Sequence, residues 1–218
     1  MKFFLDTANV DEIKEAKRWA ILDGVTTNPS HVAKEGRKFI PLIEEICDIL
    51  PDGDISVEVT ATDADGIIKE ARELASIRKN IVVKVPLTEE GIQSVSVLSK
   101  EGIRINTTLC FSAVQALIAA KVGSTYISPF VGRLDAVGSD GIEVIKQIRR
   151  IYDNYGYTTC VLAAALRHPK HVLESALAGA DVATMGFSIM EQLFQHPQTD
   201  IGLEMFLNDW TKSKDRVS

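Results

Sequence analysis

Short runs of apolar residues alternate with amphipathic stretches along the whole chain. The apolar runs are rich in valine and isoleucine and lack strict alternation, as is typical of strands buried on both faces of a parallel sheet. They predict eight strands, at residues 2–7, 24–28, 55–60, 81–86, 103–110, 125–131, 158–166 and 181–186. The stretches between them show apolar residues at helical spacing. They predict helices at residues 10–22, 39–50, 64–77, 89–100, 112–122, 141–155, 170–178 and 188–194.

Eight strand–helix units follow one another in 218 residues, without a break in composition or a long linker. This α/β pattern predicts a (β/α)8 TIM barrel that forms one domain over residues 1–218. The chain is compact for such a barrel, which usually has about 250 residues. An open, doubly wound sheet is the alternative arrangement of the same units.

A ninth helical pattern follows the last unit, at about residues 199–213. Leu203, Phe206, Leu207 and Trp210 fall at positions i, i+3, i+4 and i+7 and form an apolar stripe. Two explanations fit the stripe equally well: a helix that packs on its own barrel, and a helix that packs on a neighbouring subunit.

Composition narrows the class of protein. The chain is 45% hydrophobic and 25% charged, with a net charge of −6, which argues against a general nucleic-acid-binding or anionic-membrane surface. Cys47, Cys110 and Cys160 are widely spaced and form no CxxC pair, so neither a disulfide framework nor a zinc ribbon is indicated. The N-terminal segment turns polar after five residues and no apolar run reaches membrane-spanning length. We therefore expect a cytoplasmic protein.

Polar residues fall where a barrel carries its chemistry, at the carboxyl ends of the strands. Seven of the eight predicted strands bring a polar residue to this rim: Asp6, Asn28, Glu58, Lys84, Asn106 with Thr108, Ser128, and Arg167. A single such residue is more often a helix cap or a turn residue, and this explanation is strong for Asn28, which precedes Pro29. The convergence of so many on one rim predicts a site.

Glu58 and Lys84 interrupt apolar strands, in VEV and IVVKVP. An ion pair between them is the structural explanation, because an unpaired charge away from water is costly. The functional explanation is that burial disfavours the charged amine and leaves a nucleophile, which attacks a ketone to form an iminium. The iminium stabilises the carbanion formed when the adjacent C–C bond breaks. Asp6 and Glu58 are the candidates for moving the protons.

Arg133, in a glycine-containing segment after the sixth strand, and Arg167 are candidates for binding an anion, which suggests a phosphorylated small molecule. We expect no metal, because His168 and His171 have i, i+3 spacing but no evident third ligand. The chain lacks GxGxxG and P-loop patterns, so we expect no nucleotide cofactor.

Six motifs together resemble the transaldolase family, specifically its short microbial branch, which includes fructose-6-phosphate aldolase. DTANVDEI, GVTTNPS, VEVTA, VVKVPLT, NTTLCFSAVQA and SPFVGRLD occur in the family's order, and the resemblance spans essentially the whole chain. It implies a barrel and a metal-free lysine Schiff-base mechanism. The implied reaction converts sedoheptulose 7-phosphate and glyceraldehyde 3-phosphate into erythrose 4-phosphate and fructose 6-phosphate, in the non-oxidative pentose phosphate pathway.

The resemblance also implies roles for individual residues. Lys84 matches the lysine that binds the ketose carbonyl, and Asp6 matches the acid/base at the sugar C4 hydroxyl. Glu58 and Thr108 match a pair that holds a catalytic water. The implied substrate-binding residues are Asn28, Asn106 and Ser128 for the dihydroxyacetone unit, and Arg133 and Arg167 for phosphate.

Two positions favour a transaldolase over an aldolase, since the aldolase members have glutamine at the position of Glu58 and tyrosine at that of Phe130. Glu58 can exchange a proton, whereas Phe130 cannot hold a water; slower protonation of the enamine favours transfer to a second aldehyde. Fructose-6-phosphate aldolase is the alternative function. A non-catalytic sugar-phosphate-binding barrel is the alternative from another class.

Two further points follow from the resemblance. Ala165 stands where many transaldolases have a serine two residues before the second phosphate arginine, so one hydrogen-bond donor to phosphate is missing. This weakens the expected dependence on phosphorylated substrates. Small family members are homo-oligomers, pentamers or stacked decamers, whose last helix reaches a neighbour, and the stripe from Leu203 to Trp210 fits that arrangement.

Overall fold

The strands of the protein form one closed barrel. The structure is a computed structural model that describes residues 1–217, with side chains through residue 213; Ser218, the end of the predicted domain, lies outside the described residues. All neighbouring strands are parallel and follow sequence order, and β1 pairs with both β2 and β8. The strands are β1 (Lys2–Asp6), β2 (Gly24–Thr26), β3 (Asp54–Glu58), β4 (Ile81–Pro86), β5 (Ile105–Cys110), β6 (Tyr126–Pro129), β7 (Cys160–Ala163) and β8 (Val182–Met185). Closure confirms the predicted (β/α)8 barrel and excludes the open sheet.

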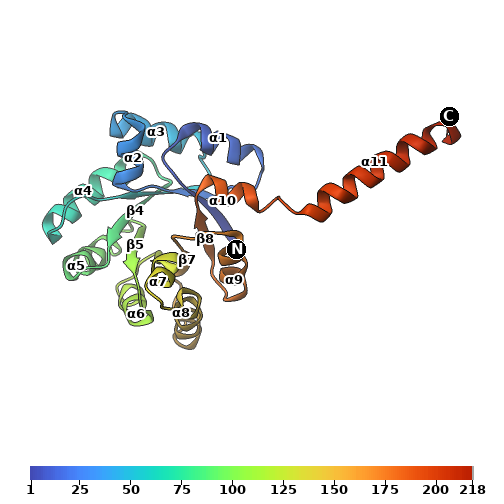
Figure 1. Ribbon diagram of the computed structural model, residues 1–218. Coiled ribbons are helices and arrows are strands. Elements are labelled where there is room, and N and C mark those ends of the chain that lie inside the picture. The colour runs from blue at the N-terminus through green and yellow to red at the C-terminus, as the bar shows by residue number, and fades with distance from the viewer. Residues whose placement is uncertain (218) are drawn as a thin grey trace.

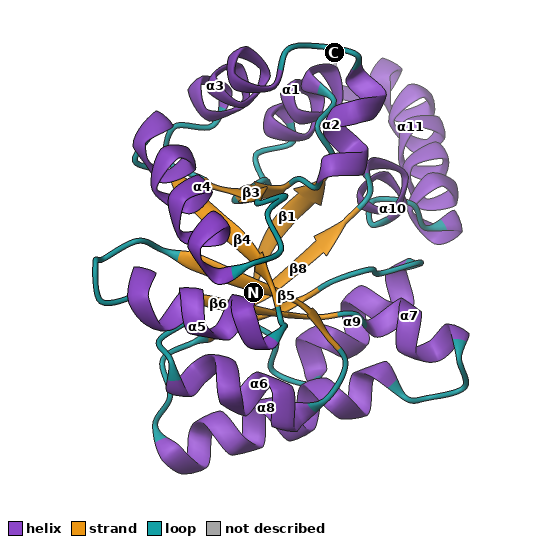
Figure 2. Ribbon diagram, turned by 90° about the vertical axis from the view of Figure 1, so that its left-hand side faces the viewer, coloured by secondary structure: helices purple, strands orange, loops and turns teal. Residues whose placement is uncertain are grey.

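Helices connect the strands and surround the barrel (Figure 2). Those before β8 are α1 (Val10–Arg18), α2 (Pro29–Glu35), α3 (Phe39–Ile49), α4 (Ala64–Ile77), α5 (Glu89–Leu98), α6 (Ala113–Lys121), α7 (Val131–Ala136), α8 (Gly141–Tyr155) and α9 (Pro169–Leu177). The helices after β8 are α10 (Phe187–Gln192) and α11 (Pro197–Val217). The bounds of α4 and α8 agree with the sequence pattern. α1 is shorter than predicted, because the backbone turns left-handed at Ala20, with φ 58°.

The sequence pattern does not predict α2 and α7. α2 begins at Pro29, where the pattern indicates a turn; proline is also favoured in the first turn of a helix, and Asn28 caps this one. α7 begins at Val131, inside the apolar run that predicts the sixth strand. The strand ends at Pro129 instead. Both short helices lie at the carboxyl end of the barrel, so they add side chains to its rim.

The strand β4 shows how the barrel accommodates a lysine. Side chains alternate between the two faces of a strand. Ile81, Val83 and Val85 belong to the large apolar core between the sheet and the helices. Val82 belongs to a separate core inside the barrel, with Phe4, Tyr126, Leu162 and Val182. Lys84 shares the inward face with Val82 and therefore lies above this inner apolar layer.

The helix α11 projects away from the barrel (Figure 1). It begins two residues earlier than predicted and extends to Val217. The side chains of Leu203, Phe206, Leu207 and Trp210 are all exposed, so the apolar stripe does not pack on its own barrel. Among the described residues, no helix combines the length and the apolar character needed to cross a membrane.

Candidate active site

The carboxyl ends of the strands open into a cavity of about 750 Å³. It is lined by nine of the ten predicted site residues: Asp6, Asn28, Glu58, Lys84, Thr108, Ser128, Phe130, Arg133 and Arg167. The register of the barrel explains part of this convergence, because Glu58 is paired with Lys84 and Lys84 with Asn106 across adjacent strands. Their side chains therefore start at one level of the barrel.

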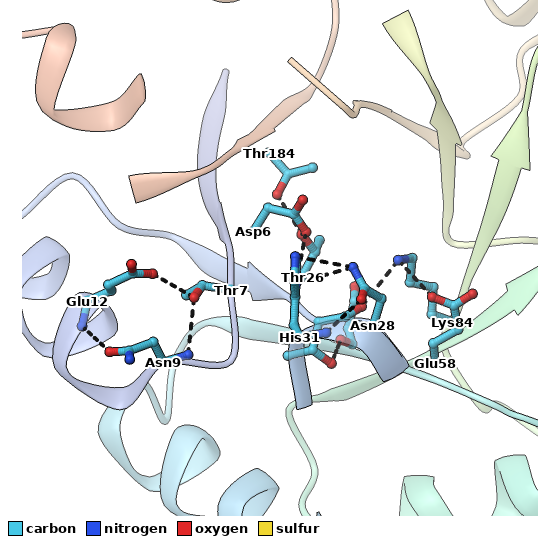
Figure 3. Close-up of polar contacts among 12 residues, drawn as sticks. Asp6, Thr7, Asn9, Glu12, Thr26, Asn28, His31, Glu58, Lys84 and Thr184 are labelled. Carbon is cyan, nitrogen blue, oxygen red and sulfur yellow. Dashed lines mark hydrogen bonds and ion pairs between the residues drawn. The ribbon is translucent and has the colours of Figure 1, made fainter. Parts of the chain in front are cut away.

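Lys84 lies at the floor of the cavity and is 6% exposed. Its Nζ is 3.0 Å from Glu58 Oε2 (Figure 3). It also donates a hydrogen bond of 3.2 Å to the carbonyl oxygen of Thr27. The ion pair that the sequence suggests is therefore present. A buried ion pair contributes little net stability. This one borders an open cavity, where a carbonyl compound can reach the amine.

Asp6 faces the same cavity from β1. Its Oδ1 accepts a hydrogen bond of 2.8 Å from Thr26 Oγ1, which is 2.6 Å from Thr184 Oγ1 (Figure 3). Its Oδ2 forms no hydrogen bond with any described residue and remains available for a ligand. Sequence reasoning missed Thr26 and Thr184, because threonine is common inside strands. Thr184 is the polar group that the eighth strand supplies.

Thr108 carries an unsatisfied hydroxyl. The residue is fully buried, and its Oγ1 has no hydrogen-bond partner among the described residues. Leaving such a group unpaired costs about 1–3 kcal/mol, so a water or a substrate atom is the expected partner. The strand is irregular next to it, with a shift of register between Thr107 and Cys110 and a left-handed backbone at Leu109, φ 59°. Such strain is typical of functional sites.

Asn106 lies beneath the cavity rather than on its wall. Its Oδ1 accepts a hydrogen bond of 2.7 Å from Ser128 Oγ, and its Nδ2 donates one of 3.1 Å to Ser56 Oγ. Asn106 and Ser56 are fully buried, whereas Ser128 lines the cavity. In this structure Asn106 therefore orients Ser128 and reaches the cavity only through it.

Asn28 is both a helix cap and a cavity residue. Its Oδ1 accepts a hydrogen bond of 2.9 Å from the backbone N–H of His31, which confirms the capping explanation. The side chain also lines the cavity, so the two explanations do not exclude each other. His31, an ordinary helix or turn residue by its pattern, lies beside it, with Nδ1 3.8 Å from Asp6 Oδ1 (Figure 3). The sequence carries no signal for this contact.

Arg133 and Arg167 line one side of the cavity. Arg133 is on α7, not in the loop that its glycine-containing segment suggests, and its Cζ is 4.8 Å from the centre of the Phe130 ring. No ion pair with a carboxylate is found for either arginine among the side chains of residues 1–213. Two guanidinium groups without carboxylate partners form a suitable site for a phosphate.

The cysteines are poor candidates for a nucleophile. None lines the cavity. Burial raises the pKa of Cys47 to about 11 and that of Cys110 to about 12, so both thiols are protonated at neutral pH. Among the side chains of residues 1–213, no group of three or more histidine, cysteine or acidic residues is placed to hold a metal ion.

The chain is similar along nearly its whole length to proteins of one family. Residues 3–217 match the family model for transaldolase/fructose-6-phosphate aldolase. A probable transaldolase of Caldicellulosiruptor saccharolyticus is 59% identical over 213 residues, which cover 97% of this chain and 98% of that protein. A probable transaldolase of Aquifex aeolicus is 56% identical over 212 residues, covering 97% of each chain. One from Methanococcus maripaludis is 56% identical over 216 residues, covering 99% of this chain and 100% of that protein.

Proposed function

The chain belongs to the transaldolase/fructose-6-phosphate aldolase family, and we propose that it is a transaldolase that acts through a Schiff base on Lys84. It transfers a dihydroxyacetone unit from sedoheptulose 7-phosphate to glyceraldehyde 3-phosphate, giving erythrose 4-phosphate and fructose 6-phosphate in the non-oxidative pentose phosphate pathway. One observation carries the proposal: a buried amine, 3.0 Å from a carboxylate, borders a cavity that also contains Asp6 and two arginines.

The first half of the reaction joins the ketose to the enzyme. Lys84 Nζ attacks C2 of the ketose, and the carbinolamine loses water to give the iminium. Glu58 is within hydrogen-bond distance of Nζ and accepts and returns the protons of these steps. The unpaired Thr108 hydroxyl holds the water together with Glu58. Asn28 and Ser128 orient the dihydroxyacetone part, and Arg133 and Arg167 bind the phosphate.

The second half breaks and remakes a carbon–carbon bond. Asp6 takes the proton of the C4 hydroxyl, the C3–C4 bond breaks, and its electron pair moves into the iminium to form an enamine. The first aldose phosphate leaves. The enamine then attacks the aldehyde carbon of the acceptor, and Asp6 returns its proton to the new hydroxyl. The hydrogen bond from Thr26 keeps the Asp6 carboxylate turned toward this position.

Comparing transfer with simple cleavage tests the proposal against the aldolase alternative. We expect the protein to transfer dihydroxyacetone from fructose 6-phosphate to erythrose 4-phosphate, with little release of free dihydroxyacetone. Phe130→Tyr should raise the ratio of release to transfer roughly tenfold, because a phenol can hold a water that protonates the enamine. Coupled assays of free dihydroxyacetone and of sedoheptulose 7-phosphate measure the two outcomes.

Phe111→Tyr is the matched control for this comparison. The Phe111 ring packs edge-on against Phe130 at 5.7 Å but does not line the cavity, so its hydroxyl should leave the ratio unchanged. Release that exceeds transfer in the wild-type protein would identify an aldolase. Ligand binding without turnover would identify the non-catalytic barrel, whose lysine serves only its pair with Glu58.

We also propose that the enzyme is a homo-oligomer, a pentamer or a decamer, in which α11 packs on a neighbouring subunit. The support is the exposed apolar stripe on a helix that projects from the barrel (Figure 1). A single-domain organisation over residues 1–218 and a cytoplasmic location complete the proposal. The three cysteines are free thiols, as is usual in a reducing compartment.

Ending the chain at Thr199 should lower its mass in solution to that of a smaller species, measured by light scattering. Phe206→Glu should act in the same direction, because it places a charge in the apolar contact. Asn208→Glu, on the same helix but outside the stripe, should leave the mass unchanged. A truncated chain with the native mass would contradict the role of α11.

A further inference from the structure

A buried histidine outside the cavity connects the two segments that carry the arginines. His171 is 6% exposed and lies on α9. Its Nε2 is 2.8 Å from Asp135 Oδ2, and its Nδ1 accepts a hydrogen bond of 3.1 Å from the backbone N–H of Arg167. Because Nδ1 accepts, the proton of the neutral ring is on Nε2, where it is donated to Asp135.

Both contacts of His171 lead to the arginines of the cavity. Asp135 lies on α7, two residues after Arg133, and its Oδ1 accepts a hydrogen bond of 2.9 Å from the N–H of Gly141 at the start of α8. The other contact is to the backbone of Arg167 itself. His171 therefore links the position of one arginine to that of the other.

The two segments also touch directly at Gly132. A Cβ on this glycine would lie 2.3 Å from the carbonyl oxygen of Ala165 and 2.7 Å from Cγ of Arg167, so only glycine allows this approach. A hydrogen bond of 3.0 Å from Val131 N–H to the Ala164 carbonyl runs beside it. The start of α7 and the loop after β7 are thus in direct contact.

The loop after β7 needs outside support. Ala165 has a left-handed backbone, φ 57°, which is unfavourable for a residue with a Cβ. The Ala164 carbonyl accepts one hydrogen bond and the Arg167 N–H donates another. These two hydrogen bonds lie on either side of Ala165 and stabilise its conformation. Ala165 also offers no hydroxyl to a phosphate, so binding depends on the spacing of the two guanidinium groups.

We propose that neutral His171 is a positioning residue that fixes the spacing of Arg133 and Arg167 and so sets the affinity for the phosphate of the substrate. The inference deepens the proposed function and rests on it. It assigns a role to one of the two histidines whose spacing in the sequence suggests only an incomplete metal site.

The charges around His171 give the link a pH dependence. Burial lowers the pKa of His171, the neighbouring imidazole of His168 lowers it further, and Asp135 and Glu174 act in the opposite direction. Protonation of Nδ1 removes the acceptor for Arg167 N–H. The hydrogen bond from Arg167 N–H to Nδ1 is therefore intact above the ordinary histidine pKa of about 6.5. It is lost as the pH falls through the lowered pKa of His171. The adjoining surface pocket is also lined by Asp140, Lys146 and Lys170.

The test compares fructose 6-phosphate with unphosphorylated fructose as donor. His171→Leu should raise the KM for fructose 6-phosphate roughly tenfold, the effect of losing one such hydrogen bond, and leave the KM for fructose unchanged. His171→Asn retains an oxygen near the position of Nδ1 but loses the contact with Asp135, so it should restore the KM for fructose 6-phosphate only in part. In the wild-type protein this KM should rise more steeply at acidic pH than in His171→Asn, which does not titrate there; protonation of the substrate phosphate, whose second pKa is about 6, affects both proteins alike.

His168→Asn is the matched control, because asparagine can still cap α9. It should retain the acidic rise in KM and move it to higher pH, since the imidazole that lowers the pKa of His171 is gone. Equal increases in KM for both donors, or an acidic rise that persists unchanged in His171→Asn, would overturn the inference. The pH dependence of KM in His171→Asn still tests the inference if His171→Leu does not fold. A wild-type protein that forms no borohydride adduct with fructose 6-phosphate would instead overturn the proposed function.

Discussion

Lys84→Met is expected to form no covalent adduct with fructose 6-phosphate under borohydride and to lower transfer by at least about a thousandfold. Methionine has nearly the length of lysine and suits the apolar layer beneath it, but it has no amine to form the iminium. Without an iminium, no group in the cavity accepts the electron pair when the C3–C4 bond breaks. Intact-protein mass spectrometry measures the adduct, and the coupled assay measures transfer.

Two variants separate loss of the nucleophile from other effects. Removing one member of a buried ion pair leaves the other unpaired, which costs about 3–5 kcal/mol when the partner is fully buried. The Glu58 side chain is 16% exposed beside the cavity, so water reduces this cost. Adding Glu58→Gln removes the charge altogether, and this double variant should fold and still form no adduct.

Lys34→Met is the matched control for the amine. Lys34 is the other lysine on the cavity wall, so it tests whether any nearby amine can react. Its removal should leave the adduct on Lys84. An adduct that peptide mapping places on Lys34, or one that persists in Lys84→Met, would contradict the mechanism.

Two of the charged residues on the cavity wall could be predicted from the sequence because each conflicts with its surroundings. Lys84 and Glu58 stand inside apolar strands, and the period of two between side chains on one face of a strand accounts for Val82 and Lys84 pointing inward together. The strand count then leads to a closed barrel, which brings Asp6 and Arg167 to the same rim. Charge in an apolar run is a strong signal since burying it is costly.

Other features of the site could not be predicted from the sequence, because they depend on the height of a residue along the barrel axis or on tertiary contacts. Asn106 and Thr108 share one face of β5, but only Thr108 lines the cavity, because alternation gives the side of the sheet and not the height along the barrel. Threonine is common in strands, so the sequence around Thr184 gives no sign that this side chain belongs to the site. His171 contacts Asp135, a residue far away in the sequence, and the backbone of Arg167, and its spacing from His168 in the sequence indicates neither contact. The stripe on α11 could be predicted as an apolar face, but the surface that packs against it could not.

The ion pair between Lys84 and Glu58 is compatible with catalysis because both members border the cavity. In a fully enclosed pair, the amine would be unable to meet a carbonyl carbon. Here the Glu58 carboxylate can take a proton from Nζ directly, so the contact that stabilises the charged amine also provides the route to its neutral form. The ion pair is the state of the site before the substrate binds. When the ketone reacts, Nζ gives up a proton to Glu58 and bonds to the carbonyl carbon instead.

Asp6→Asn is expected to stop the reaction one step later than Lys84→Met. The amide oxygen can still accept the hydrogen bond from Thr26, so the side chain should stay in place. It cannot take the proton of the C4 hydroxyl. Transfer should therefore fall about 10²–10⁴-fold, the usual contribution of a general base. Imine formation at C2 uses Glu58 and should continue, so the borohydride adduct should accumulate with the whole ketose attached.

The mass of that adduct gives a sharp test of the order of steps. With Asp6→Asn, the trapped species should carry all six carbons and the phosphate of fructose 6-phosphate, whereas the wild-type enzyme should also yield the three-carbon dihydroxyacetone adduct. Thr26→Val keeps the carboxylate and removes only the hydrogen bond that orients it, so its loss of activity should be smaller. If Asp6→Asn instead prevents the adduct, Asp6 acts in imine formation, and the division of proton transfers between Asp6 and Glu58 must be reversed.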